Sequence, residues 1–129
     1  MSEKNNNIIG SIGWVDLTIP NASELREFYK NVVGWKSEGL SMGEYEDFVM
    51  ISPSDNQPKA GVCHKRGGNS EFPSVWMVYF TVKNIDDSIR LVKESGGKIL
   101  VDIKIMDGYG KYCVIEDPAG AVCALFENI

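Results

Sequence analysis

The sequence predicts an α+β fold made of two tandem βαβββ modules, and an internal repeat is the main observation behind this prediction. The alternating strand pattern of residues 13–19 recurs at residues 76–82, with equivalent positions 63 residues apart. A helical pattern that ends at glycine follows each strand, and three strand-like segments follow each helix. We therefore expect two sheets, each with a helix on one face, whose other faces close around a shared cleft.

Each of the two repeated strands has one apolar file and one mixed file, because side chains alternate between the faces of a strand. The apolar file suits packing against a helix, so the mixed file is expected to face the cleft. The apolar files are Val15, Leu17, Ile19 and Val78, Phe80, Val82, and the mixed files are Trp14, Asp16, Thr18 and Met77, Tyr79, Thr81.

The two predicted helices carry start and stop signals. Each begins at an asparagine, Asn21 or Asn84, with an acidic residue three positions later, which is the spacing of a capping box. Each ends at a glycine, Gly34 or Gly97, which we predict to be its C-cap. The residues expected to face the core are Leu25, Phe28, Tyr29 and Val32 in the first helix and Ile85, Ile89 and Val92 in the second.

The remaining strands complete the two modules. A turn is predicted at residues 117–120, where Pro and Gly stand as a type I turn prefers. A ferredoxin-like β-α-β sandwich is a competing prediction, but it does not need the third strand after each helix. Residues 1–129 are then one domain, with module one at about 8–65, a connector at 66–74 and module two at about 75–127. The strands are predicted near residues 35–39, 45–51 and 59–65, and near 98–103, 111–116 and 121–127.

The composition is that of a globular domain, with 129 residues of which 43% are hydrophobic and 24% are charged. A formal net charge of −5 argues against binding to nucleic acid or to an anionic membrane surface. Three cysteines without a C-x-x-C motif are expected to be free thiols in a reducing cytosol. The polar segment Met1–Asn7 lacks the apolar core of a signal peptide, and no apolar run could span a membrane, so we expect a cytoplasmic protein.

Short motifs along the chain resemble the vicinal oxygen chelate (VOC) superfamily. Trp14-x-Asp-Leu-Thr-x-Pro20, Phe28-Tyr29 and Gly34-Trp35 resemble its opening module, and Glu116-Asp-Pro-Ala-Gly120 with Ala124-Leu-Phe-Glu127 resembles the end of its second module. The superfamily includes glyoxalase I, bleomycin-resistance proteins, fosfomycin-resistance enzymes and extradiol dioxygenases. The resemblance implies an incomplete β-barrel around a cleft (the glyoxalase/bleomycin resistance/dihydroxybiphenyl dioxygenase-like fold) and a homodimer. It implies no single reaction, because this fold hosts several chemistries and also pure binding.

Metal-dependent members of this superfamily place one ligand on the first strand and one on the last strand of each module. By the resemblance, three of these positions fall on Trp14, Met77 and Ala124, and the fourth falls on Gly61 or His64, depending on the alignment of strand 59–65. At least three of the four ligands are therefore replaced by residues that do not suit Zn²⁺, Ni²⁺ or Fe²⁺. A catalytic metal generally needs about three protein ligands. We therefore expect neither a metal nor another cofactor.

Asp16 is the main candidate for chemistry. A carboxylate in mid-strand on the cleft side would be partly desolvated, so it could serve as a general acid or base, or anchor a ligand amine or hydroxyl. The alternative is a structural aspartate paired with Tyr79, Thr18 or a backbone N–H group.

The predicted ligand-binding residues are aromatic, methionine and polar side chains. Aromatic and methionine side chains suit flat organic ligands, but they suit a hydrophobic core equally well. One of the predicted residues lies in the glycine-flanked loop 106–110, which could close over a ligand or be an ordinary connector. The set is Trp14, Asp16, Thr18, Met77, Tyr79, Tyr109 and Phe126.

Two other features of the first module have simpler interpretations. His64, the single histidine, is expected to be a surface residue or a hydrogen-bonded core residue. It is not expected to form a catalytic pair with Cys63, because adjacent residues on a strand point to opposite faces. The acidic residues Glu44, Glu46 and Asp47 are expected to form a solvated strand edge.

Three functions remain open from the sequence. The first is metal-free binding of a small organic molecule. The second is an enzyme, either a glyoxalase-like lyase or isomerase or a dioxygenase-like enzyme, with Asp16 as acid or base or with a non-standard metal site. The third is a non-catalytic interaction module whose cleft is filled by its own side chains.

Overall fold

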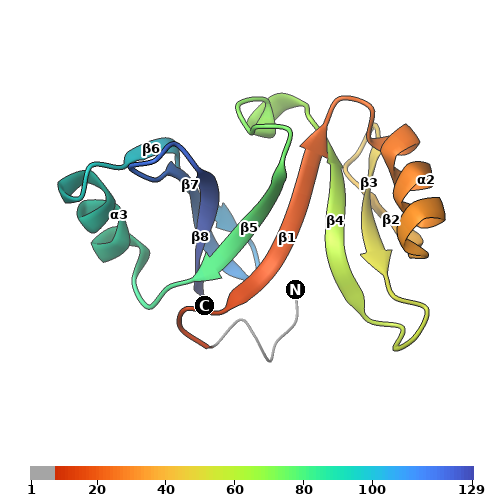
Figure 1. The fold of residues 1–129 in the computed structure, drawn as a ribbon, viewed down its shortest axis with the longest axis horizontal. Helices are drawn as coiled ribbons and strands as arrows, with labels where there is room; N and C mark the ends of the chain where they lie inside the picture. Colours follow the sequence, from red (N-terminus) through yellow and green to blue (C-terminus); the bar gives the residue numbers. More distant parts are fainter. Residues whose placement is uncertain (1–7) are drawn as a thin grey trace. The chain divides into compact units, whose positions relative to one another are not determined.

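The computed structural model describes residues 8–129, so the segment Met1–Asn7 lies outside the described residues. Within this range the chain forms eight strands and two α-helices, which confirms the predicted α+β fold (Figure 1). These elements form two compact units. The first unit comprises residues 15–76, and the second comprises residues 8–14 and 77–129. No helix within residues 8–129 is long and apolar enough to cross a membrane.

The first unit has a helix and four strands in the predicted order. Its strand order is β2-β3-β4-β1, in which β1 and β4 are parallel and the other neighbours are antiparallel. The third strand after the helix, β4, is the one that a ferredoxin-like arrangement would lack. The elements are β1 (Ile12–Ile19, whose first residues belong to the second unit), α2 (Ala22–Val33), β2 (Lys36–Ser41), β3 (Glu46–Ile51), β4 (Pro58–His64) and the short 3₁₀ helix η1 (Gly67–Asn69).

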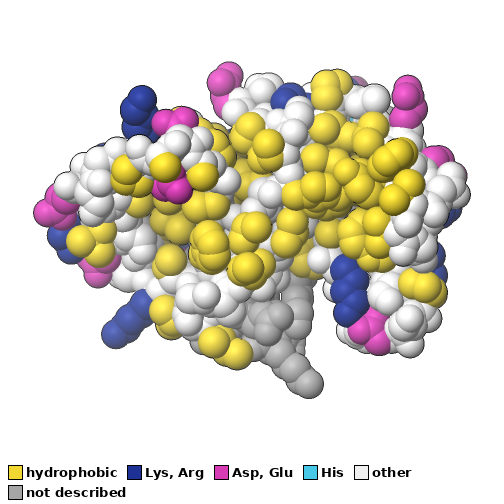
Figure 2. Space-filling model, viewed as in Figure 1, with side chains coloured by type: hydrophobic (Ala, Val, Ile, Leu, Met, Phe, Trp, Pro, Cys, Tyr) yellow, Lys and Arg dark blue, Asp and Glu magenta, His cyan; other side chains and the backbone are white. Residues whose placement is uncertain are grey.

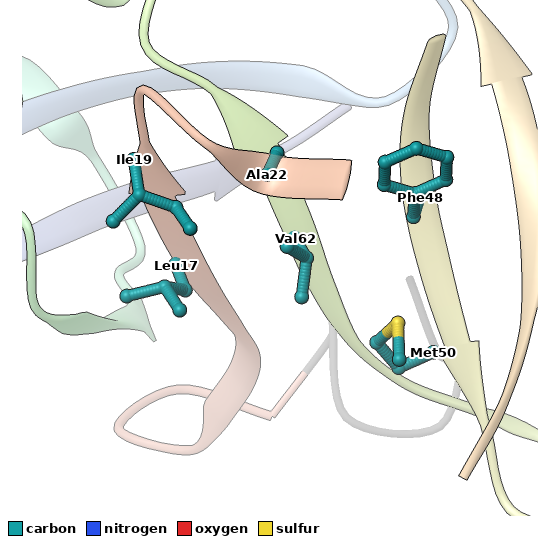
Figure 3. Close-up of a cluster of buried hydrophobic side chains, with 6 residues drawn as sticks. All are labelled: Leu17, Ile19, Ala22, Phe48, Met50 and Val62. Carbon is teal, nitrogen blue, oxygen red and sulfur yellow. The ribbon is translucent and has the colours of Figure 1, made fainter. Parts of the chain in front are cut away.

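The core of the first unit lies between its sheet and α2. Leu17 and Ile19 from the apolar file of β1 pack there, which confirms their predicted orientation (Figure 3). Leu25 and Tyr29 of α2 pack against this core, as predicted. The prediction for the other two helix positions was wrong, because Phe28 and Val32 are more than half exposed. The buried cluster consists of Leu17, Ile19, Ala22, Phe48, Met50 and Val62.

Only one of the two predicted signals at the ends of α2 is formed as expected. Gly34 adopts a left-handed conformation with φ of 88°, and its N–H donates to the carbonyl of Lys30, which confirms the C-cap. Asn21 precedes the helix, but its side chain makes no capping hydrogen bond. Its φ and ψ of −109° and 51° lie outside the extended region in which an N-cap side chain reaches the first turn. The first predicted capping box was therefore wrong.

The second unit repeats the same arrangement. Its strand order is β5-β8-β7-β6, with β5 and β8 parallel and the other neighbours antiparallel. The predicted turn at residues 117–120 is confirmed by a hydrogen bond from the Gly120 N–H to the Asp117 carbonyl. The elements are β5 (Trp76–Thr81), α3 (Ile85–Glu94), β6 (Lys98–Met106), β7 (Gly110–Glu116) and β8 (Val122–Asn128).

The core of the second unit lies between its sheet and α3. Ile85 is fully buried there, and Ile89, Val92 and Val82 pack against the cluster, as predicted. Phe80 departs from the prediction, because this apolar-file residue is exposed. The buried members of the cluster are Ile85, Cys113, Ile115 and Leu125.

The ends of α3 confirm one predicted cap and correct the other. The Asn84 side chain accepts a hydrogen bond from the Asp87 N–H at 2.9 Å, so Asn84 is the N-cap. At the other end the C-cap is Ser95, and the left-handed residue is Gly96, with φ of 89°, so the prediction of Gly97 as the C-cap was wrong. Gly97 is needed for a different reason: a Cβ atom there would lie 2.9 Å from the backbone carbonyl oxygen of Glu116.

Candidate functional site

The parallel strand pairs have the same register in both units. In the first unit Asp16 on β1 is paired with Gly61 on β4, and in the second unit Tyr79 on β5 is paired with Ala124 on β8. Each member of the second pair lies 63 residues after its counterpart in the first. Gly61, and not His64, therefore occupies the position equivalent to Ala124. This decides between the two alignments that the sequence left open.

By the resemblance, the positions of the metal ligands in metal-dependent VOC proteins correspond to Trp14, Gly61, Met77 and Ala124. An indole, a hydrogen atom, a thioether and a methyl group do not form a donor set for Zn²⁺, Ni²⁺ or Fe²⁺. Among residues 8–129, no group of three or more His, Cys, Asp or Glu side chains could hold a metal ion. The residues present at these positions do not fit the divalent metal that the fold implies.

Asp16 lies on the face of β1 that points away from α2. Its strand neighbour Leu17 packs on the helix side, so the alternation of the strand turns Asp16 the other way. The carboxylate is partly exposed, and its partner residue Gly61 presents no side chain beside it. Thr18, on the same face, is buried. Asp16 is therefore the accessible polar residue of the predicted set on this face, and its role in binding stays a prediction.

A partly buried thiol lies close to Asp16. Cys63 is paired with Thr18, and burial raises the pKa of the Cys63 thiol far above its ordinary value. The negative charges of Asp16 and Asp47 raise this pKa further. Because the thiolate is the nucleophilic form of cysteine, Cys63 is held in its unreactive protonated state at neutral pH.

In the second unit, the face of the sheet away from α3 carries most of the other predicted ligand-binding residues. Met77, Tyr79 and Phe126 lie there, and all three are buried, Phe126 with 1% of its surface exposed. The rings of Tyr79 and Tyr112 lie 6.0 Å apart between centroids. This burial makes Met77 and Phe126 part of the packed interior of the protein. Trp14, at the start of β1, is partly exposed.

Tyr109 lies in a tight turn between β6 and β7. Its N–H donates to the Met106 carbonyl at 2.9 Å, and its own carbonyl accepts from the Ile129 N–H at 3.0 Å. The side chain is 50% exposed. A hollow of about 270 Å³ lies beside the turn, bordered by Met106, Gly108 and residues at the end of β8. The backbone of this segment is therefore fixed at both sides of Tyr109, and its predicted contact with a ligand stays a prediction.

Asp47 and His64 form a partly buried pair that the sequence did not reveal. Asp47 was predicted to lie on a solvated edge, but only 6% of it is exposed. Its Oδ1 atom accepts a hydrogen bond from the His64 backbone N–H at 2.8 Å and lies 3.4 Å from His64 Nδ1. Asn69 Nδ2 donates to the His64 carbonyl at 2.9 Å. His64 is thus a hydrogen-bonded structural residue, which was one of its two predicted roles.

The His64 ring stands in a row of aromatic and cationic side chains. Its centroid is 5.4 Å from that of Tyr45 and 6.0 Å from that of Phe48. The guanidinium of Arg66 lies 4.1 Å from the Tyr45 centroid, and that of Arg26 lies 4.4 Å from the Phe48 centroid. The imidazole at the end of β4 thus lies against the rings of Tyr45 and Phe48 and beside the Asp47 carboxylate, and the two guanidinium groups make cation–π contacts with these rings. No local pattern in the sequence links these residues, because they come from separate segments.

The buried thiol Cys113 gives the fold a testable dependence on alkaline pH. Burial raises the pKa of Cys113 from its ordinary value of 9.0 to about 11. Below pH 9 the thiol is protonated in both states, whereas between about pH 9 and 11 only the unfolded chain ionises. Stability should therefore fall across this window, by at most about 1.4 kcal/mol per pH unit for this group. Urea unfolding should show a shallower pH dependence for Cys113→Ala than for the wild type, and an equal slope would contradict the assignment.

The comparison with family models agrees with this geometry. Residues 11–125 match the model of the Glyoxalase/Bleomycin resistance protein/Dioxygenase superfamily. This match covers most of the chain, and the two βαβββ units have the fold of that superfamily. The chain belongs to the Glyoxalase/Bleomycin resistance protein/Dioxygenase superfamily, as its motifs indicated.

The individual proteins that resemble this chain have low sequence identity to it. The anthracycline biosynthesis protein DnrV of Streptomyces peucetius is 28% identical over 131 aligned positions, which cover 92% of this chain and 47% of DnrV. The chain thus spans about half the length of this curated relative. Methylmalonyl-CoA epimerase from Streptomyces coelicolor has a TM-score of 0.60 at 13% identity, with 94% of this chain and 99% of that chain covered. A superfamily member from Vibrio splendidus 12B01 has a TM-score of 0.60 at 12% identity, with 89% and 97% covered. At these identities the structural similarity concerns the fold alone.

Proposed function

We propose that this protein binds a small organic molecule and uses no divalent metal to do so. The observation that supports the proposal is the shared strand register, which makes Gly61 on β4 and Ala124 on β8 equivalent residues. By the resemblance, these are the last-strand ligand positions of metal-dependent relatives. The first-strand positions hold Trp14 and Met77. Aromatic and apolar side chains at these places favour an organic framework over an ion.

The surface of the sheets supports an organic ligand. Figure 2 shows hydrophobic side chains gathered over the strands of each unit, with most charged side chains toward the margins. Asp16 is the exception among the predicted contacts, because it offers a carboxylate on such a face. We propose that Asp16 of the first unit accepts a hydrogen bond from an amine or hydroxyl group of an organic ligand. For the second unit, we propose that Trp14, Tyr79 and Tyr109 contact an organic framework.

The similarity to DnrV is consistent with an organic ligand, because DnrV is named for the biosynthesis of anthracyclines. Since the chain covers less than half of DnrV, this similarity does not define the ligand of the present protein. It favours the screening of aromatic natural-product frameworks first.

One observation favours a second candidate function. Met77 and Phe126 are buried in the described structure. This burial is expected if the protein is a non-catalytic interaction module whose site is filled by its own side chains. The effect of Asp16 on ligand affinity distinguishes the two candidates, because a module filled by its own side chains binds no ligand that Asp16 could contact. An enzymatic role, with Asp16 as acid or base, is a further outcome, and it is detected when each ligand found is incubated with the protein and analysed for product.

A screen of small organic molecules by thermal shift tests the proposal, with Asp16→Asn as the informative variant. We expect ligands to raise the melting temperature of the wild type and Asp16→Asn to weaken their affinity by about tenfold, because a charge-assisted hydrogen bond is lost. The matched control is Asp102→Asn, which removes an exposed carboxylate from β6.

The possible results separate the three functions. The absence of any ligand would favour the interaction module. Equal affinity for the wild type and Asp16→Asn would remove Asp16 from the binding site. A ligand that the wild type converts to product, and Asp16→Asn binds without converting, would establish an enzyme.

We also propose that the protein acts in the cytoplasm as a homodimer. The absence of disulfides among Cys63, Cys113 and Cys123 is consistent with a reducing compartment. Phe28 and Val32 expose apolar surface on α2, of the kind that association with a second copy would cover. Sedimentation velocity measurements on the purified protein test the dimer.

A further inference from the structure

One buried polar atom of the second unit has no hydrogen-bond partner. Among the described residues, the hydroxyl Oγ1 of Thr81 is buried and unpaired, and only 1% of the residue is exposed. The backbone of Thr81 is fully engaged, since its N–H donates to the Ser11 carbonyl at 2.9 Å and its carbonyl accepts from the Gly10 N–H at 2.8 Å. The strand is therefore fixed, and the hydroxyl cannot gain a partner through a shift of the backbone.

An unpaired buried hydroxyl is unfavourable for the free protein, because it loses its hydrogen bonds to water on folding. Valine has nearly the same shape without this penalty, and β-branched residues of both kinds suit a strand. Packing alone would therefore favour valine at this position. A hydrogen bond that the hydroxyl forms only in a bound state of the protein would explain why threonine occupies this position.

The position of Thr81 indicates what that state is. Thr81 shares a strand face with Met77 and Tyr79, and it is paired with Phe126 on β8. These are three of the predicted ligand-binding residues. The tilted ring pair of Tyr79 and Tyr112 lies on the same face. Thr81 thus contributes a buried hydroxyl without a partner to a face of mainly aromatic and apolar side chains.

We infer that Thr81 Oγ1 is a specificity-determining contact for the ligand, and that this ligand is a flat aromatic molecule with a carbonyl or hydroxyl oxygen. The inference rests on the proposed function and names the ligand class for the same site. The aromatic side chains suit a planar ring system, and the hydroxyl donates a hydrogen bond to an oxygen of that system. Because the hydroxyl is covered in the free protein, neighbouring side chains must move first, and association should be slower than for an open site.

The first test needs no ligand. Thr81→Val should raise the melting temperature, by roughly 3–10 °C, because the unpaired hydroxyl is removed while the shape is kept. Thr81→Ser, which keeps the hydroxyl and loses the methyl group, should not raise it. A melting temperature of Thr81→Val equal to or below that of the wild type would mean that the hydroxyl has a partner in the free protein, and would overturn the inference.

The second test uses two soluble probes of equal charge and ring number, anthraquinone-2-sulfonate and anthracene-2-sulfonate. Only the first carries ring oxygens. We expect the wild type and Thr81→Ser to bind the quinone at least tenfold more tightly, and Thr81→Val to bind both equally. A preference that persists in Thr81→Val would overturn the role of Thr81. If neither probe binds the wild type, the ligand class inferred here is wrong, whereas the proposed function is judged separately on the wider screen with Asp16→Asn.

Discussion

Phe126→Ala is expected to lower the free energy of unfolding by about 3–5 kcal/mol, because the variant leaves a large cavity in a packed interior. Phe126 is a predicted ligand-binding residue, but only 1% of its surface is exposed in the free protein. Its ring lies on β8 between β5 and β7, where it is paired with Thr81 on one side and Tyr112 on the other. The structure therefore predicts that Phe126 stabilises the fold even if it also borders a ligand.

Urea unfolding followed by circular dichroism measures this effect. The matched control is Tyr109→Ala, because Tyr109 is another aromatic residue of the predicted set but is half exposed. We expect this control to change stability by less than about 1 kcal/mol, as surface substitutions usually do. Similar losses for the two variants, or a loss below that range for Phe126→Ala, would show that Phe126 is not part of the packed interior.

Gly110→Ala is expected to have the second large effect, a loss of about 3 kcal/mol or more, since a backbone clash in a buried strand forces the chain to shift. A Cβ atom at Gly110 would collide with the backbone carbonyl oxygen of Glu127 on β8 and lie 3.1 Å from the Asn128 Cα. Both groups belong to the backbone, so no change of rotamer relieves the collision. The β7–β8 pair would have to separate locally.

The control for this experiment is Gly108→Ala in the same turn. Gly108 has a φ of 82°, but a methyl group added there would have no atom of another segment within 4 Å, so only the cost of a left-handed alanine applies. That cost is about 1–2 kcal/mol. Thermal and urea unfolding should rank the variants as wild type, Gly108→Ala, Gly110→Ala in falling stability. A Gly110→Ala variant as stable as Gly108→Ala would show that β8 does not approach Gly110 as closely as described.

The internal repeat explains why the fold could be predicted from the sequence. The alternation of apolar and mixed residues identified β1 and β5, and the other six strands were expected as strand-like segments. Glycine marked the end of α2, whereas the predicted C-cap of α3, Gly97, lies two residues after the C-cap Ser95. The same repeat, once the pairs Asp16–Gly61 and Tyr79–Ala124 were known, fixed the alignment of the fourth ligand position. The sequence alone could not choose between Gly61 and His64, because both alignments kept the apolar pattern of strand 59–65.

The predictions of burial were wrong where they rested on local sequence patterns alone. Phe28 and Val32 have the helical spacing of core residues, but the core of the first unit does not extend to them, and they remain exposed. Asp47 belongs to an acidic run, but a long-range hydrogen bond to the His64 backbone buries it. Thr81 appeared in the mixed file with no sign that its hydroxyl would lack a partner. Such features depend on contacts between distant segments.

The residues that the resemblance assigns to metal-ligand positions do not suit a divalent metal. In the first unit the residue that replaces a ligand is a glycine beside the Asp16 carboxylate, and in the second it is an alanine beside Tyr79. Under the proposed function, the specificity of binding depends on a few polar atoms such as those of Asp16 and Thr81.

The metal content of the purified protein tests the proposed function most directly. Mass spectrometry should be performed on the protein as isolated and after incubation with Zn²⁺, Ni²⁺, Mn²⁺ and Fe²⁺ followed by desalting. We predict far less than one metal ion per chain in every sample, because Trp14, Gly61, Met77 and Ala124 provide no suitable set of donors. One tightly held ion per chain would contradict the proposal and would favour a metal-dependent enzyme.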